Sequence, residues 1–231
     1  MDELREFMEI LRQVGPENIW RPVYSPGNEL LADGAGELCN GLPPNLEQFD
    51  FKNKTVADIG CNFGHYTFIV KRNGSRHVTG IDADCRIIRG CRILKRLFGV
   101  DGVSFLAADI ADSDGLGTFD TGMMIDFIGK KMVRTGIFKE YLDALERLSK
   151  KEMILSIKPV YQIRKHLNGD FQAIREIYPG DYIRNNSFFT IDYICDRFRD
   201  RWHVEIVASN RGCGDTDKKI LYFTRKNSLD T

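Results

Sequence analysis

Several features that would place this chain in a special class are missing. The 231 residues carry no excess charge, since 33 Lys and Arg balance 33 Asp and Glu. No apolar run approaches the roughly 18 residues that a membrane span requires. Residues 1–5 lack the basic start of a signal peptide. We therefore expect a cytoplasmic protein without membrane attachment and without a broad electrostatic attraction for nucleic acid.

Clustered metal ligands and a disulfide framework are also missing. The chain has four histidines, and no two of its six cysteines form a C-x-x-C pair. Structural zinc sites need clustered ligands, and disulfide frameworks belong to small secreted domains. We therefore expect no metal and reduced thiols. The cysteines are Cys39, Cys61, Cys85, Cys91, Cys195 and Cys213.

The first 53 residues differ in pattern from the rest. Residues 2–13 have the apolar spacing of a short amphipathic helix, whereas residues 14–53 are irregular and rich in proline and glycine. Long irregular segments in compact proteins are often lids or binding loops. We expect residues 1–53 to form an N-terminal extension or lid, and residues 54–226 to form one folded domain.

Strands and helices alternate after residue 54. We expect strands at 56–59, 77–81, 103–107, 119–125 and 153–157, and helices at 65–72, 85–98 and 133–149. This alternation predicts a parallel sheet covered on both faces. A helix at 190–200 and strands at 203–208 and 219–224 complete the chain. The short connection between those two strands contains Gly212 and Gly214, so we expect this pair to be antiparallel.

The residues that indicate a ligand-binding site lie in the turn from Asp58 to Gly64, between a strand and a helix. Glycines there allow a tight turn and let a ligand approach the backbone. Asp82 ends the next strand, where a carboxylate can accept hydrogen bonds from both hydroxyls of a ribose. The position of Asp58 places negative charge near the expected ligand.

A dinucleotide is the first alternative for that ligand. Its binding turn reads G-x-G-x-x-G, and the middle glycine admits the pyrophosphate. Here Asn62 replaces that glycine, and Asp58 would repel a pyrophosphate. S-adenosylmethionine (SAM) has no phosphate and carries a positive ammonium and sulfonium, so the charges favour SAM.

Residues 54–158 resemble the class I SAM-dependent methyltransferases. Residues 56–64 resemble their first motif, 80–82 the second, 107–110 the third and 119–126 the fourth. The resemblance implies a Rossmann-like α/β fold with seven strands, mostly parallel, and an antiparallel C-terminal strand. It also implies a cofactor site made of Asp58, Gly60, Cys61, Asn62, Gly64, Asp82, Ala83, Asp109, Ile110 and Asp126.

The acceptor and the reaction type remain open. Residues 126–130 follow the fourth motif without the N-P-P-Y signature of amino-group methylation, which leaves Asp126 and Lys130 as the catalytic candidates. Residues 14–53 and 159–189 are expected to supply the acceptor pocket. A small-molecule acceptor is favoured; a tRNA-modifying enzyme and a non-catalytic SAM-binding protein are the alternatives. Residues 80–82 and 119–121 are also similar to enzymes that modify the tRNA wobble uridine.

A basic stripe on the helix at 85–98 bears on the RNA alternative. Such a stripe can bind phosphates, although a solvated polar helix face is the commoner explanation. Its members are Arg86, Arg89, Arg92, Lys95 and Arg96.

Overall fold

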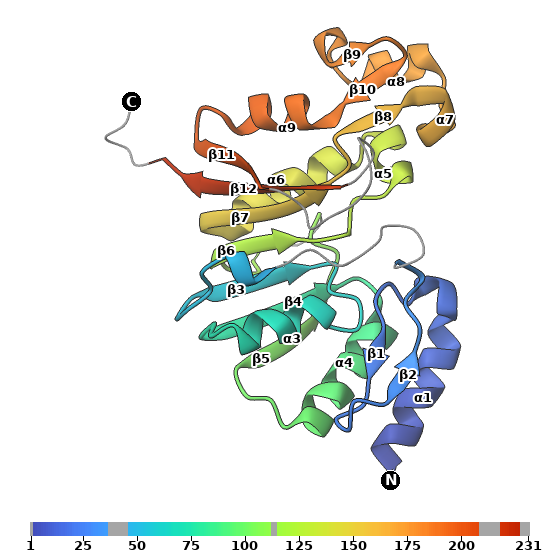
Figure 1. Ribbon diagram of the computed structural model, residues 1–231, viewed down its shortest axis with the longest axis vertical. Coiled ribbons are helices and arrows are strands. Elements are labelled where there is room, and N and C mark those ends of the chain that lie inside the picture. Colours follow the sequence, from blue (N-terminus) through green and yellow to red (C-terminus); the bar gives the residue numbers. More distant parts are fainter. Residues whose placement is uncertain (1, 37–45, 112–114, 208–217, 227–231) are drawn as a thin grey trace.

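A seven-stranded sheet runs through the centre of the molecule (Figure 1), in a computed structural model that describes residues 2–36, 46–111, 115–207 and 218–226. Its strands are β3 (Thr55–Ile59), β4 (His77–Asp82), β5 (Val103–Ala107), β6 (Phe119–Met124), β7 (Ser149–Ile157), β11 (Trp202–Val207) and β12 (Lys219–Arg225). They lie in the order β11-β12-β7-β6-β3-β4-β5. Strand β12 pairs antiparallel with β7 and β11, and the pairs among β3 to β7 are parallel. The expected fold, including its antiparallel C-terminal strand, is confirmed.

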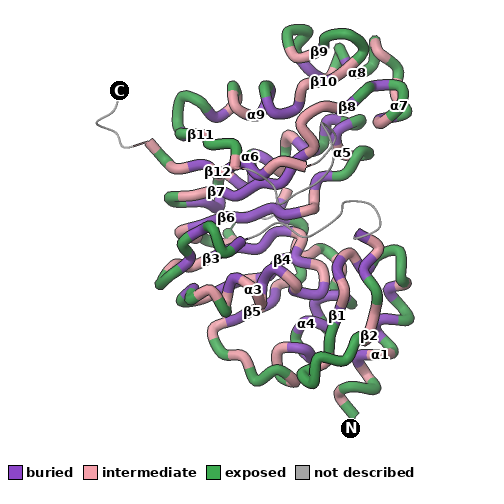
Figure 2. The backbone as a smooth tube through the Cα atoms, viewed as in Figure 1, coloured by how far each residue is buried: buried purple, intermediate pink, exposed green. Residues whose placement is uncertain are grey.

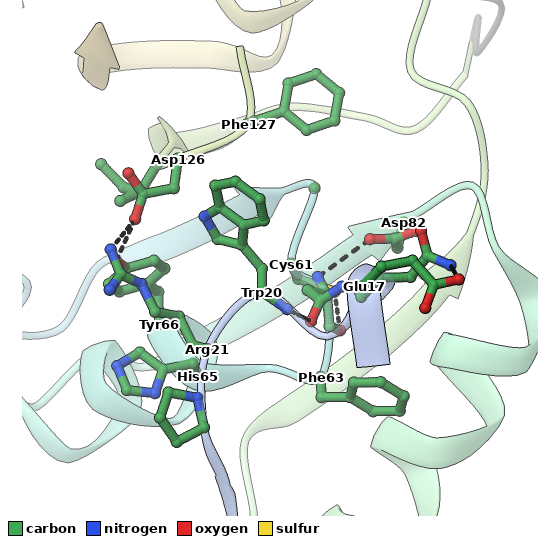
Figure 3. Close-up of a pocket in the computed structure, with 15 residues that line it drawn as sticks. Glu17, Trp20, Arg21, Cys61, Phe63, His65, Tyr66, Asp82, Asp126 and Phe127 are labelled. Carbon is green, nitrogen blue, oxygen red and sulfur yellow. Dashed lines mark hydrogen bonds and ion pairs between the residues drawn. The ribbon is translucent and has the colours of Figure 1, made fainter. Parts of the chain in front are cut away.

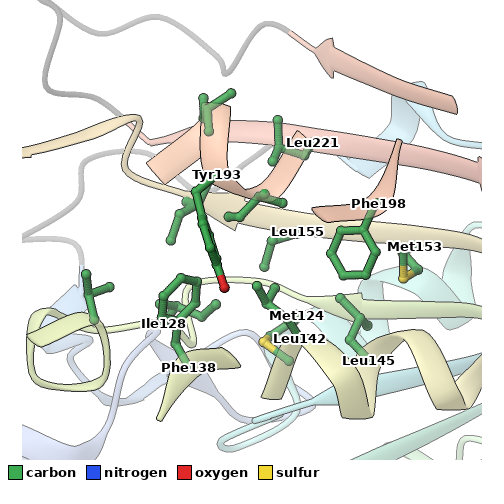
Figure 4. Packing of buried hydrophobic residues seen from close by; sticks show 14 of the residues in the cluster. Met124, Ile128, Phe138, Leu142, Leu145, Met153, Leu155, Tyr193, Phe198 and Leu221 are labelled. Carbon is green, nitrogen blue, oxygen red and sulfur yellow. The ribbon is translucent and has the colours of Figure 1, made fainter. Parts of the chain in front are cut away.

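Alternate residues of the strands are buried on opposite faces of the sheet, which explains their nearly continuous apolar sequences. Val56 packs on the face covered by α3 (His65–Arg72). Its neighbours Ala57 and Ile59 pack on the face covered by α6 (Phe138–Leu148) and α9 (Thr190–Phe198). The central strands β3, β6 and β7 are accordingly buried along most of their length (Figure 2). Figure 4 shows part of the cluster beneath α6 and α9.

The N-terminal helix α1 (Asp2–Val14) packs along α4 (Cys85–Phe98), as Figure 1 shows. Its buried side chains are Phe7, Ile10, Leu11 and Val14. Its acidic face meets the basic stripe of α4. Glu3 pairs with Arg96 at 2.5 Å and Glu6 pairs with Arg89 at 2.6 Å. Helix α1 therefore extends the core and neutralises part of the stripe.

The expected helix at 133–149 was wrong in its bounds, because the structure divides this segment into two helices. Helix α5 (Lys130–Thr135) ends at Gly136, whose φ of 81° lies in the left-handed region that glycine tolerates. Helix α6 then begins at Phe138. The apolar spacing continues across the break because Val133 and Leu145 belong to the same core cluster. Strand β7 follows directly and begins at Ser149, four residues earlier than expected.

Residues 158–189 form a separate small structure beyond β7, at the top of Figure 1. It contains β8 (Val160–Gln162), α7 (Ile163–Leu167), α8 (Phe171–Ile177), η3 (Gly180–Tyr182), β9 (Ile183–Arg184) and β10 (Ser187–Phe189). Its three strands form an antiparallel sheet. The Tyr178 and Phe188 rings stack at 4.2 Å and join it to the main core.

The segment after α1 is less irregular than the sequence indicates. It contains η1 (Pro16–Asn18), a hairpin of β1 (Val23–Tyr24) and β2 (Leu30–Ala32), and η2 (Leu46–Gln48). The turn expected around Gly212 and Gly214 lies outside the described residues. No helix in the described part of the chain has the length and apolar composition needed to cross a membrane.

The carboxyl ends of β3, β4 and β6 meet at one edge of the sheet. The chain leaves β3 toward β4 on one side, while β6 pairs with β3 on the other. Ligands of open α/β sheets bind at such a reversal of strand order. The Gly60 turn, Asp82 and Asp126 therefore gather at one place although they are distant in the sequence.

Candidate functional site

The turn after β3 is held tightly against β4. The N–H groups of Gly60 and Cys61 both donate to the carbonyl of Ile81, at 2.8 and 3.1 Å. Gly60 has a φ of 70°, and a Cβ built on it would lie 2.0 Å from the ring of Phe127. Any other residue at Gly60 would strain the backbone and collide with that ring.

Asp82 organises the same turn from the end of β4. Its carboxylate accepts hydrogen bonds from the N–H groups of Asn62 and Asp84, each at 3.0 Å. Burial raises the pKa of Asp82, although the two backbone donors oppose this. Each oxygen retains capacity for a further hydrogen bond. Because Asp82 also lines the pocket described below, its carboxylate can both hold the turn and accept from a ligand.

Asp58 lies beneath the turn, outside the wall of the pocket. Its side chain is buried and accepts a 2.5 Å hydrogen bond from the Thr67 hydroxyl. Burial raises the pKa of Asp58 to about 7. The expected contact between Asp58 and the cationic part of SAM therefore stays a prediction, and the observed role is to join the turn to α3.

A pocket of about 290 Å³ lies over the turn. Figure 3 shows Asp82 and Glu17 at one end, Asp126 and Arg21 at the other, and Trp20 between them. Among the residues expected to bind cofactor, Gly60, Cys61, Asn62, Asp82 and Asp126 line it. The structure thus brings together five positions that the sequence motifs spread over 67 residues, counted from Gly60 to Asp126.

The remaining expected residues lie around this pocket. Gly64 has a φ of 79° and precedes α3, Ala83 is exposed, and Ile110 is buried in the main core. Asp109 is exposed and accepts hydrogen bonds from the Tyr141 hydroxyl at 3.0 and 3.2 Å. The Tyr141 ring packs 5.0 Å from that of Phe127, which lines the pocket. Asp109 is therefore linked to the pocket through two aromatic rings.

Asp126 is the centre of a buried ion cluster. Its carboxylate pairs with Arg21, accepts from the Tyr66 hydroxyl at 2.7 Å and pairs with Lys218 at 2.9 Å. Its N–H donates to the Ser156 hydroxyl at 2.7 Å. Burial raises the pKa of Asp126, but the charges of Lys218 and Arg21 outweigh it and hold the pKa below its ordinary value.

These contacts limit the chemistry available to both catalytic candidates. An ionised Asp126 that already accepts three hydrogen bonds is poorly placed to take a proton from an acceptor, and it serves instead to hold Arg21 and Tyr66. Lys130 is the first residue of α5, is exposed and does not line this pocket. The assignment of either residue to catalysis stays a prediction.

His65 offers a neutral ring beside this cluster. Burial, and then the charge of Arg21, lower the pKa of His65 to about 4. Its ring lies edge-on to Tyr66 at 5.0 Å, and it lines the pocket. Within the described residues, its buried Nε2 atom has no hydrogen-bond partner. His65 is thus a neutral, buried polar group in the pocket wall.

The residues that the sequence motifs missed come mainly from the segment after α1. The Trp20 N–H donates to the Asn62 side-chain oxygen at 3.0 Å, and the Asn62 amide donates to the Asn18 carbonyl at 2.8 Å. Arg21 crosses to Asp126, which is 105 residues away in sequence. No motif marks these residues; their only signal is an Asn-x-Trp-Arg stretch inside a segment expected to be a lid.

The two thiols near the turn are structural. Cys61 and Cys91 are buried, and both donate to the Asn62 carbonyl, at 3.4 and 3.0 Å. Burial raises the pKa of the Cys61 thiol well above its ordinary value. Nucleophilic cysteines need a lowered thiol pKa, so Cys61 supports the turn without offering a thiolate.

Curated relatives match only part of the chain. The tRNA U34 carboxymethyltransferases of Shewanella halifaxensis and Shewanella pealeana are 34% and 36% identical to it over 71 and 70 residues. Each match covers 30% of this chain and 22% or 21% of the relative. The match thus spans about a fifth of the length of these relatives, so it does not assign their substrate to this chain.

Solved structures support the fold. A magnesium protoporphyrin IX methyltransferase from Synechocystis PCC 6803 with bound SAH superposes with a TM-score of 0.52 at 16% identity, covering 77% of this chain and 76% of that one. A putative S-adenosylmethionine-dependent methyltransferase from Listeria monocytogenes superposes with a TM-score of 0.51 at 15% identity, covering 78% and 94%.

The family follows from a model described as a methyltransferase domain, which matches residues 50–218. The match spans most of the chain and contains all four motifs. It includes the turn after β3, Asp82 and Asp126. The chain belongs to this methyltransferase family, and it is a class I enzyme that uses S-adenosylmethionine as its cofactor.

Proposed function

We propose that the enzyme methylates a small-molecule acceptor that binds at the Asp126 end of the pocket. The observation that carries this proposal is the cover over the pocket. Residues 18–21 are bonded to Asn62 on one side and to Asp126 on the other. A polymeric acceptor would have to displace this cover, whereas a small molecule can be enclosed by it.

The charges along the pocket fit SAM. At one end, the carboxylates of Asp82 and Glu17 line the wall and are suited to accept hydrogen bonds from ribose hydroxyls. SAM supplies a methyl group that its sulfonium makes electrophilic.

The chain's own contribution to methyl transfer is then mainly geometric. Trp20 and Phe127 cover the turn and exclude water, while the cluster around Asp126 fixes the wall that the acceptor meets. Holding two reactants in line can lower a barrier by roughly 7–11 kcal/mol. This account requires no covalent intermediate, in agreement with the structural role of Cys61.

A tRNA acceptor is the second candidate, favoured by the names of the curated relatives. The basic stripe of α4 supports a tRNA acceptor less in the structure than it does in the sequence. Arg89 and Arg96 of the basic stripe pair with α1, and Arg86 pairs with Asp84 at 2.6 Å. These pairs reduce the charge that the stripe could offer to a phosphate backbone.

An assay of S-adenosylhomocysteine release separates the two acceptors. The purified enzyme is incubated with SAM and either the small-molecule fraction of a cell extract or total tRNA. We expect product with the small-molecule fraction and none with tRNA, and less product at limiting SAM when Asp82→Ala replaces the parent. Release that requires tRNA would overturn the proposed acceptor class.

A further inference from the structure

A group of basic side chains lies beside the acceptor end of the sheet. Lys158 follows β7, Lys130 begins α5, and Lys165 and His166 belong to α7. Helices α5 and α7 pack against each other next to the ends of β6 and β7 (Figure 1). Burial, and then the charges of Lys158, Lys165 and Lys130, lower the pKa of His166. The three cations therefore lie close enough to act on this imidazole, and Lys158 is in direct contact with it.

Their position relative to the pocket follows from the strands. The Asp126 N–H donates to the Ser156 hydroxyl, and Lys158 lies two residues further along the chain. Two residues of extended chain span about 7 Å. Lys130 lies four residues after Asp126. The basic group is thus adjacent to the Asp126 end of the pocket, where the proposed function places the acceptor.

The hydrogen bonds of His166 decide which nitrogen carries its proton. The Gln162 N–H donates to His166 Nδ1 at 3.0 Å, so Nδ1 is an acceptor. A neutral imidazole must then carry its proton on Nε2. The Lys158 ammonium lies 3.5 Å from Nε2. Two donors face each other, and neither can accept from the other.

We propose that an oxyanion of the acceptor, a carboxylate or a phosphate, bridges Lys158 Nζ and His166 Nε2. This inference rests on the proposed function and narrows its substrate to anionic small molecules. An anion would accept from both donors and remove their mutual repulsion. Within the described residues, Lys130 and Lys165 form no ion pair, so their charges also act on the anion.

The test follows the imidazole nitrogens by two-dimensional ¹H–¹⁵N NMR of the full chain without SAM. Inorganic phosphate and acetate are titrated separately at constant ionic strength. We expect the His166 signals to show a proton on Nε2 and to move saturably with at least one anion. The signals of His77 and His203 should stay unchanged. The anion that binds more tightly identifies the favoured group.

Two lysine variants provide the comparison. Lys158→Met should weaken anion binding about ten- to a hundredfold, because a charge-assisted hydrogen bond is lost. Lys150→Met removes an exposed lysine near the other end of the same strand and should leave the affinity unchanged. The remaining imidazole signals show whether each variant keeps its fold.

Three outcomes would overturn the anion site: a proton on Nδ1, no saturable shift, or equal affinity in Lys158→Met and the parent. Tighter binding of tRNA than of either small anion at His166 would overturn the small-molecule assignment. The NMR titration contains no SAM, so a negative result in it does not test methyl transfer. Methyl transfer is tested by the assay of S-adenosylhomocysteine release. Failure of that assay alone leaves the anion site standing.

Discussion

At the scale of single residues, Asp126 shows how a motif position acquires its chemistry from distant partners. The fourth motif predicted an acidic residue at the end of β6. It could not predict that Arg21 and Lys218 bind that acid, because these contacts join segments 105 and 92 residues away. No local pattern encodes such a pairing. The position of Asp126 was predictable, whereas its protonation state and its contacts were not.

The buried pair of Asp126 and Arg21 should be important for stability. Both side chains are only 3% exposed. Asp126→Asn leaves the guanidinium buried without its counter-charge and should cost about 3–5 kcal/mol in the free energy of unfolding. Urea denaturation measures this directly.

An exposed ion pair of the same chemistry is the control for that change. Arg184 and Asp192 are 54% and 49% exposed. Asp192→Asn should cost less than about 1 kcal/mol. An equal loss in the free energy of unfolding in Asp126→Asn and Asp192→Asn would mean that the buried ion pair of Asp126 and Arg21 is no more important for stability than an exposed one.

Asp58 should make stability depend on pH in an unusual direction. Burial raises its pKa from 3.8 to about 7. Between about pH 4 and 7 the unfolded carboxyl loses its proton while the folded one keeps it, so the free energy of unfolding falls as pH rises. Asp58→Asn removes this dependence and still accepts from Thr67.

Urea titrations of the parent and Asp58→Asn at a series of pH values test this sign. The difference parent minus variant should decrease between about pH 4 and 7 and should be flat on either side. The same difference at every pH would show that the Asp58 carboxyl is not perturbed in the folded protein.

At the scale of elements, the apolar periodicity of the sequence located most helices and strands, and its errors have local causes. Gly136 ends α5, but the apolar spacing continues because α5 and α6 face the same core. The hairpin of β1 and β2 was missed because strands of two and three residues have no measurable period. The positions of whole elements relative to each other, above all α1 on α4, depend on contacts that periodicity does not contain.

The packing of α1 predicts that the first 53 residues support stability as well as covering the pocket. Phe7 is fully buried, and its ring lies edge-on to that of Phe63 at 5.8 Å. Phe7→Ala should cost about 3–5 kcal/mol. Leu4→Ala, on the same helix but 37% exposed, should cost about 0.5 kcal/mol or less.

Thermal or urea unfolding of these two variants distinguishes a core helix from a separable lid. If Phe7→Ala unfolds like the parent, α1 is dispensable for stability. In that case residues 1–53 would form a detachable extension, as the sequence pattern alone suggests.

At the scale of the whole molecule, a net charge of zero conceals an uneven distribution. Acidic residues of α1 pair with the basic stripe of α4, while Lys130, Lys158 and Lys165 lie near His166. The order of charges along the sequence could not reveal this, because the fold decides which cations are paired. The sheet topology, by contrast, was predictable, since the motifs and the alternation of elements point to the same arrangement.

The central claim is that the pocket between Asp82 and Asp126 binds SAM, and isothermal titration calorimetry tests it most directly. We predict that the parent binds SAM with one site and does not bind NADH. Asp82→Ala should weaken SAM about ten- to a hundredfold, from loss of charge-assisted hydrogen bonds. Asp84→Ala should match the parent, because the Asp84 carboxylate caps α4 through the Arg86 N–H at 2.8 Å. A parent chain that binds NADH and ignores SAM would contradict the account.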